Sequence, residues 1–112
     1  MTEKTRTQTL STEVKPLAEL LQYQDRAIVS RVLLKNKGGT VTIFAFDQDE
    51  GLSEHTAPFD AFVFIMDGEA EVAIAGKIYR VRQGETITLP ANIPHALKAA
   101  TRFKLLLTMI RG

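Results

Sequence analysis

The sequence predicts an all-β fold, a sandwich or small barrel, from three observations. From Ala27 onward, apolar residues recur with a period of two in short runs rich in Val, Ile, Phe and Thr. Glycine dipeptides such as Asp67-Gly68 and Ala75-Gly76 separate these runs, and glycine readily takes the positive φ that tight hairpin turns require. A chain of 112 residues, 45% hydrophobic and 24% charged, is typical of one globular domain with one core.

The amino-terminal residues are expected to form a mobile arm. Residues 1–13 are rich in Thr, Gln, Lys and Glu and have almost no large apolar side chains, so packing cannot offset the entropy lost on ordering. Pro16 then stands where the first turn of a helix tolerates proline, and Leu17 and Leu20 follow at one-turn spacing, which predicts a single helical turn. We expect residues 14–112 to form a single barrel domain.

The strands are predicted from the apolar runs between the turn residues. Short strands at this spacing are typical of sandwiches and small barrels. Their predicted ranges are Ala27–Lys35, Thr40–Asp47, Ala61–Asp67, Glu69–Ala75, Lys77–Arg82, Thr86–Leu89, His95–Ala99 and Phe103–Ile110.

Some of these strands are apolar on both faces. Ala61, Val63 and Ile65 point one way, the residues between them are also apolar, and the last run, Phe103–Ile110, shows the same pattern. A sheet with one face in water does not need this, so extra layers or a second copy of the chain should cover the outer face. We therefore predict a homodimer.

The charged residues argue against several classes of partner. The 14 basic and 13 acidic side chains are mixed along the chain and leave a net charge of +1, so no electrostatic footprint for nucleic acid is present. No apolar run approaches the length of a membrane span, and the amino terminus lacks the apolar core of a signal peptide. We expect no nucleic-acid or membrane partner and a cytoplasmic protein. The absence of cysteine excludes disulfides and thiolate catalysis.

Two segments, each with one of the only two histidines, carry a family resemblance. The segment Gly51–Gly68 resembles the first sequence motif of the cupin superfamily, which contains two histidines and a glutamate. Counting back from its last glycine, His55 stands at the first histidine position, Ala57 at the second and Ala61 at the glutamate position. One of three ligands is therefore retained here.

The segment Gly84–His95 is similar to the second cupin motif. Gly84, Pro90 and His95 stand at the spacing of the family, whereas Asn92 replaces an inner glycine. The resemblance extends over about residues 41–110. It implies a double-stranded β-helix, the jelly-roll cupin barrel.

The resemblance also implies a metal site inside the barrel, which in the family consists of three histidines and a glutamate. Only His55 and His95 remain, so we expect a degenerate centre for a divalent transition metal whose identity the sequence does not give. Pro90 and Pro94 restrict the backbone before His95 and should present its imidazole from a stiff loop.

The pocket is predicted to be lined by Ala57, Ala61, Val63 and Ile65, whose small alanines should enlarge the interior. Asp60 lies beside the vacated glutamate position, but strand alternation directs it away from Ala61. Its carboxylate could therefore support the site only through a bulge or a bend.

Three functions stay open at this point, because the cupin fold hosts many unrelated activities. The first is metal binding through the two histidines, in a protein whose catalytic activity is undecided. The second is a metal-free module that binds or senses a small molecule, and the third is a structural dimeric barrel. The chain has no nucleophile elbow and no phosphate-binding glycine loop, so no reaction is assigned.

Overall fold

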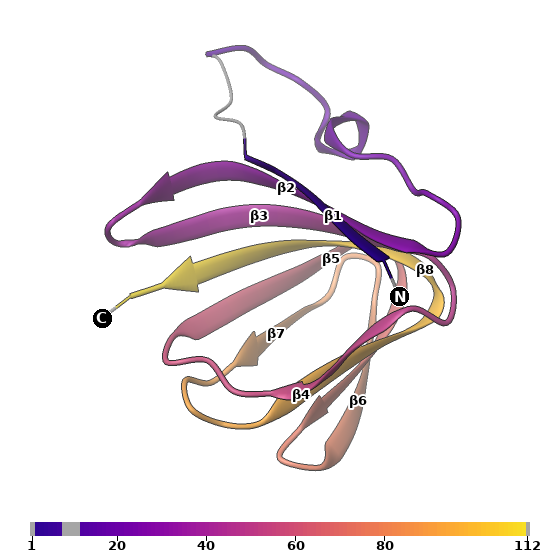
Figure 1. The fold of residues 1–112 in the computed structure, drawn as a ribbon, viewed down its shortest axis with the longest axis vertical. Coiled ribbons are helices and arrows are strands. Elements are labelled where there is room, and N and C mark those ends of the chain that lie inside the picture. Colours follow the sequence, from indigo (N-terminus) through magenta and orange to yellow (C-terminus); the bar gives the residue numbers. More distant parts are fainter. Residues whose placement is uncertain (1, 8–11, 112) are drawn as a thin grey trace.

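Eight strands and one short 3-10 helix are present in the computed structural model, which describes residues 2–7 and 12–111 (Figure 1). The strands pair antiparallel, except for β1, which lies parallel to β2. The elements are β1 (Thr2–Thr7), η1 (Leu17–Leu20), β2 (Ala27–Asn36), β3 (Gly39–Phe46), β4 (Gly51–His55), β5 (Asp60–Ile74), β6 (Lys77–Arg82), β7 (Thr86–Leu89) and β8 (His95–Ile110).

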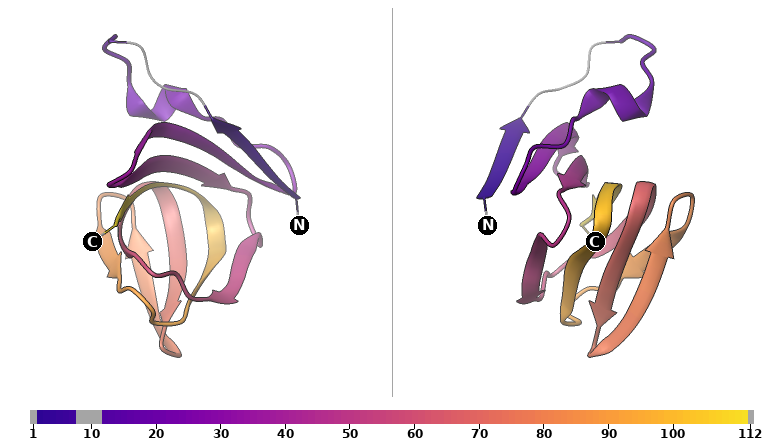
Figure 2. Two further views of the ribbon diagram at one scale, coloured as in Figure 1. Left: turned by 60° about the vertical axis from the view of Figure 1, so that its left-hand side comes forward. Right: turned by 90° about the vertical axis from the view of Figure 1, so that its right-hand side faces the viewer.

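The strands β5 and β8 belong to two facing layers. Residues 60–65 of β5 pair with β7 and with the end of β8, in a first layer that continues through β3 and β2 to β1. Residues 70–74 of β5 pair with β6 and with the start of β8, in a second layer that also contains β4. Figure 2 shows the two layers curving around a shared interior. The all-β fold is as predicted.

The sequence predicts two strands in the place of β5 and two in the place of β8, and this prediction is wrong. The expected hairpin turn at Gly68 is a bulge, at which the register between β5 and β8 shifts. Gly68 has φ +74°, and a Cβ atom there would overlap the carbonyl oxygen of Arg102 on β8. The strand β5 bends from one layer into the other at Gly68. The residue there is a glycine because β8 passes too close to leave room for a side chain.

The remaining elements agree with the predictions to different degrees. The bounds of β6 and β7 are those predicted, and the expected helical turn is η1. The strand β4 was not predicted. Thr2–Thr7 form β1, where a mobile arm was expected, whereas residues 1 and 8–11 of that arm lie outside the described residues. The division into an arm and a barrel domain stays a prediction.

The main core lies between the two layers. Phe46 and Phe103 stack in its centre, with ring centroids 4.4 Å apart and planes inclined by 13°. Each is fully buried, so this pair removes a large apolar area from water. The other fully buried apolar members include Ile28, Ile65, Ala70, Val72 and Ala99.

A second, smaller core covers the outer face of the first layer. Leu20, Leu21 and the ring of Tyr23, from the segment before β2, pack on Ile43 and Ala45 of β3. Figure 2 shows this segment outside β2 and β3. Part of the outer apolar face is therefore covered by the chain itself.

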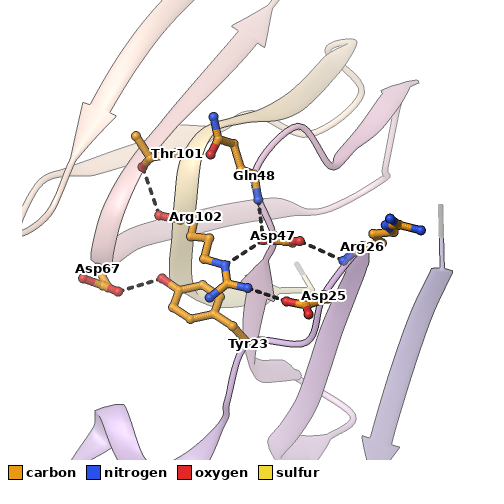
Figure 3. A network of polar contacts seen from close by, with 8 residues as sticks. All are labelled: Tyr23, Asp25, Arg26, Asp47, Gln48, Asp67, Thr101 and Arg102. Carbon is orange, nitrogen blue, oxygen red and sulfur yellow. Dashed lines mark hydrogen bonds and ion pairs between the residues drawn. The ribbon is translucent and has the colours of Figure 1, made fainter.

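A polar network holds this segment against the barrel (Figure 3). The hydroxyl of Tyr23 donates to Asp67 Oδ2 at 2.7 Å, and Arg102 donates to Asp25 Oδ1 and Asp47 Oδ1, both at 2.7 Å. The Arg102 guanidinium, with backbone N–H groups, lowers the pKa of Asp47 from 3.8 to about 2. Burial, followed by the hydrogen bond to Asp67, raises the pKa of Tyr23 well above its ordinary value.

Candidate functional site

His55 reaches the barrel interior through an irregularity in β4. Leu52 pairs with Leu97 of β8, and His55 pairs with His95, so three steps on β4 match two on β8. Without the extra residue, strand alternation would direct Glu54 inward and His55 outward. This bulge is the local feature that places the imidazole of His55 opposite that of His95.

His95 follows a loop that is fixed by hydrogen bonds from its backbone N–H groups. The N–H of Asn92 donates to the carbonyl oxygen of Ala57 at 2.7 Å, and the N–H of Ala91 donates to Asp60 Oδ1 at 2.8 Å. Asn92 has φ +63°, a left-handed conformation that asparagine tolerates better than most residues. It can therefore occupy the position of the glycine in the family motif.

The two imidazoles contact each other at the mouth of the barrel. Their ring centroids are 4.4 Å apart and their planes are inclined by 66°, an edge-to-face arrangement. His95 is buried, with 7% of its surface exposed, whereas His55 is exposed. The pair thus joins an interior group to one that solvent reaches.

Both rings are oriented by the backbone in the same way. His55 Nδ1 lies 2.8 Å from the carbonyl oxygen of Ser53, and His95 Nδ1 lies 3.2 Å from that of Ile93. A carbonyl oxygen only accepts, so each Nδ1 donates, and Nε2 of the neutral ring keeps its lone pair. A histidine that binds a metal is usually oriented by such a hydrogen bond from its other nitrogen.

The imidazole pair borders a small apolar cavity with a volume of about 70 Å³. This volume has room for a few water molecules or a short apolar group. Four lining residues come from the second layer and six from the first. They are Leu52, His55, His95 and Leu97, and Phe44, Phe46, Val63, Leu89, Leu105 and Leu107.

The predicted pocket residues are distributed differently from the expectation. Of the four, Val63 lines the cavity. Ala61 and Ile65 are buried in the main core, on the same strand but away from the cavity wall. Ala57 lies in the loop between β4 and β5 and does not line the cavity either. Alternation along β5 identifies the inward residues but not those that reach this cavity.

Asp60 contributes through the loop instead of through the imidazoles. Its side chain is at the first position of β5, and Oδ1 accepts the hydrogen bond from Ala91 described above. The carboxylate therefore helps to fix the segment before His95. No bend of β5 toward the imidazoles is needed for this contact.

A divalent metal would find two protein ligands at this site. The Nε2 atoms of His55 and His95 fit an ion of intermediate softness, such as Zn²⁺, Ni²⁺ or Fe²⁺. Within residues 2–7 and 12–111, however, no group of three or more His, Cys, Asp or Glu residues could hold an ion. Water or ligand atoms would have to complete the coordination.

The family model for the cupin domain matches residues 42–110. The chain belongs to the cupin family. This agrees with the motif resemblance, which extends over about the same part of the chain. The comparison with curated proteins finds no match.

Solved cupin structures resemble the chain over most of its length. A conserved protein of unknown function from Streptococcus pyogenes is 34% identical, with TM-score 0.87, covering 92% of this chain and 90% of that one. A cupin 2 conserved barrel domain protein from Leptotrichia buccalis is 42% identical, with TM-score 0.82, and the match covers 85% of this chain but 46% of that one. The salicylate 1,2-dioxygenase of Pseudoaminobacter salicylatoxidans, at 12% identity and TM-score 0.70, shares the fold alone.

In the described part of the chain, no helix has the length and apolar character needed to cross a membrane.

Proposed function

We propose that this cupin binds one divalent transition-metal ion through Nε2 of His55 and His95. The observation that supports the proposal is the matched pair of Nδ1 hydrogen bonds, which leaves both Nε2 atoms as electron-pair donors on rings in contact. When bound, the ion would supply a Lewis acid next to the apolar cavity. The protein would orient the two ligands and keep most coordination positions open to a small molecule. No reaction is assigned.

The test is the metal content of untagged protein, measured by elemental mass spectrometry before and after chelation. We expect about one metal ion per chain in the wild type, and its loss in His55→Ala and in His95→Ala with folding retained. Lys98→Ala, an exposed change on the same strand as His95, is the matched control and should keep the metal. Full metal content in both histidine variants would show that the ligand assignment is wrong.

A second function is favoured by the wall of the cavity. Apart from the two imidazoles, every lining residue has a hydrocarbon side chain. In the absence of a metal, the same Nε2 atoms would accept hydrogen bonds from a small molecule with a short apolar group and a donor at the mouth. Metal-free protein that folds and is stabilised against heat by such molecules would favour this alternative.

We also propose that the protein is a homodimer and acts in the cytoplasm. The dimer is supported by apolar side chains on the outer face of the first layer that the amino-terminal segment does not cover, among them Phe62, which is 47% exposed. If the barrel has a purely structural role, the third function considered above, this outer surface is the part of the molecule that would carry it out.

A further inference from the structure

The inner face of β6 carries a cation without an anionic partner. Val81 is buried in the main core, so Tyr79 and Lys77, two and four residues earlier, also face the interior. Lys77 Nζ lies 5.2 Å from the centroid of the Tyr79 ring, which is 37% exposed. Among the described residues, Lys77 forms no ion pair. Its positive charge is therefore available at the open end of the barrel.

The outer face of the same strand shows the opposite arrangement. Arg80 Nη1 and Arg82 Nε donate to the two carboxylate oxygens of Glu69, at 2.8 Å and 3.2 Å. This pairing lowers the pKa of Glu69, mainly through the hydrogen bond from Arg80. The two cations that face away from the interior thus share one carboxylate, whereas Lys77 on the inner face has no carboxylate partner among the described residues.

Strand register places Lys77 in one row with the imidazole pair. His55 lies opposite His95, His95 opposite Ile74, and Ile74 opposite Lys77. Directly opposite residues of antiparallel strands share a face. Lys77 and His95 are separated by two strand spacings, about 9.5 Å between backbones. A flexible lysine stem can therefore bring its charge toward a molecule bound at the histidines.

The backbone holds the two parts of this row together. Ala75 and Gly76 have φ +51° and +82°, the conformation of a tight hairpin turn, directly before Lys77. The N–H of Ala75 donates to the carbonyl oxygen of Pro94 at 2.9 Å, the residue before His95. The starts of β6 and β8 are therefore fixed relative to each other.

We infer that Lys77 and Tyr79 complete the ligand site and select a small organic acid, whose carboxylate pairs with Lys77. The ring of Tyr79 flanks the Lys77 ammonium, and the short apolar part of the acid enters the cavity beside Leu97. A carboxylate supplies the negative charge that the inner face lacks. The inference rests on the proposed function, because it assigns the ligand of the same site.

The experiment is an amide NMR titration of isotope-labelled protein that has been stripped of metal and dialysed free of chelator. The probes are butyrate, the uncharged butan-1-ol of similar size, and inorganic phosphate. We expect butyrate to shift the signals of Lys77, Tyr79 and His95 in the wild type. Lys77→Met should weaken butyrate binding about tenfold, since one charge-assisted hydrogen bond is lost. Arg80→Met, which removes an equal charge from the outer face, should bind like the wild type.

Several outcomes would overturn the inference. These are equal affinity of Lys77→Met and wild type, equal responses to butan-1-ol and butyrate, and a stronger response to phosphate than to butyrate. A Lys77→Met protein that only aggregates more, with unchanged butyrate affinity, would mean that the lysine merely protects the edge of β6 from pairing. The metal content of Lys77→Met is measured separately and should equal that of the wild type. Failure of the metal proposal and failure of this inference are then distinguishable.

Discussion

At the scale of single residues, the candidate site depends on backbone carbonyls more than on side-chain partners. Ser53 and Ile93 each orient the imidazole two residues later, and this sets which ring nitrogen is left for a ligand. Asn92 accepts a backbone conformation that most residues avoid, and so lets the loop close on Ala57. Substitutions that alter the backbone at these positions would change the orientation of the imidazoles while both histidines stay in the chain.

Asp47 gives a prediction about acid stability. Because Arg102 and neighbouring N–H groups lower its pKa from 3.8 to about 2, the folded state gains stability from ionised Asp47 above pH 3.8. This contribution should be lost as the pH falls through the range down to about 2. In Asp47→Asn, the free energy of unfolding should not show this decrease on acidification. Near neutral pH, it should be lower than that of the wild type. Urea unfolding across the pH range measures both effects.

A second variant separates the ion pair from the backbone contacts of Asp47. In Arg102→Gln, the carboxylate keeps its bonds from the N–H groups of Arg26 and Gln48 but loses the guanidinium. The folded-state pKa of Asp47 should then lie closer to 3.8, so the loss of stability on acidification should be smaller than in the wild type and should end at a higher pH. An unchanged pH profile in Arg102→Gln would contradict the role given to this arginine.

At the scale of elements, the bends of β5 and β8 build the barrel. Each strand runs through both layers and pairs with the other strand in each of them, so continuous backbone joins the two layers at two places. Gly68 marks the bend of β5, at the point where β8 comes closest. The barrel therefore depends on the lack of a side chain at this position.

We predict that Gly68→Ala destabilises the protein by about 3 kcal/mol or more, since it combines a positive φ with overlap on the backbone of β8. Gly76→Ala is the matched control. Gly76 has φ +82°, but a Cβ atom there would meet nothing within 4 Å, so the cost should be about 1 kcal/mol. Denaturant unfolding of both variants gives the comparison. Equal losses would mean that the close approach of β8 is relieved by a shift of that strand.

The elements also show what the sequence could and could not predict. Period-two runs between turn residues located most strands, and β6 and β7 were correct at both ends. The glycine signal at Gly68 was correct for positive φ, yet the same conformation serves a turn and a bulge. Only the partner strand decides between them. The strand β4 is short and mostly polar, so it lacks the apolar run from which the other strands were predicted.

The candidate site was predictable to the same partial extent. The family motifs pointed to both histidines, and the structure brings their rings into contact. Most of the cavity wall was not predicted, because it comes from β3, β4, β7 and β8 as well as β5. Leu97 could have been found, since it is two residues after His95 and must share its face. Leu52 and Phe44 depend on how the layers meet, which alternation along one strand does not show.

At the scale of the whole molecule, an apolar row crosses the outer face of the first layer. Register places Leu34, Val41, Thr108 and Phe62 opposite one another in turn, and Leu34 is 57% and Phe62 47% exposed. Ile110, 58% exposed, extends this outer row. Such a patch, next to a face that the chain covers itself, is typical of a surface that meets a second copy.

We predict that light scattering after size exclusion gives about twice the chain mass of 12.4 kDa. Phe62→Glu should yield the monomer mass, because it replaces an exposed apolar side chain of the outer row with a charge. Ile78→Glu is the control, since Ile78 is 59% exposed but lies on β6, outside that row, and should leave the dimer intact. A wild type with the monomer mass at micromolar concentration would remove the dimer from the proposal.

The bulge of β4 has one more consequence. With regular pairing, Glu54 would lie opposite His95. The extra residue in the bulge places His55 there instead. If β4 slid by a single position, the barrel would offer an imidazole and a carboxylate, a pair that suits harder cations than two nitrogens do. In the proposed metal site, the register between β4 and β8 therefore sets which ligand atoms face the ion, and an insertion or deletion near Ser53 would change them with both histidines still in the chain.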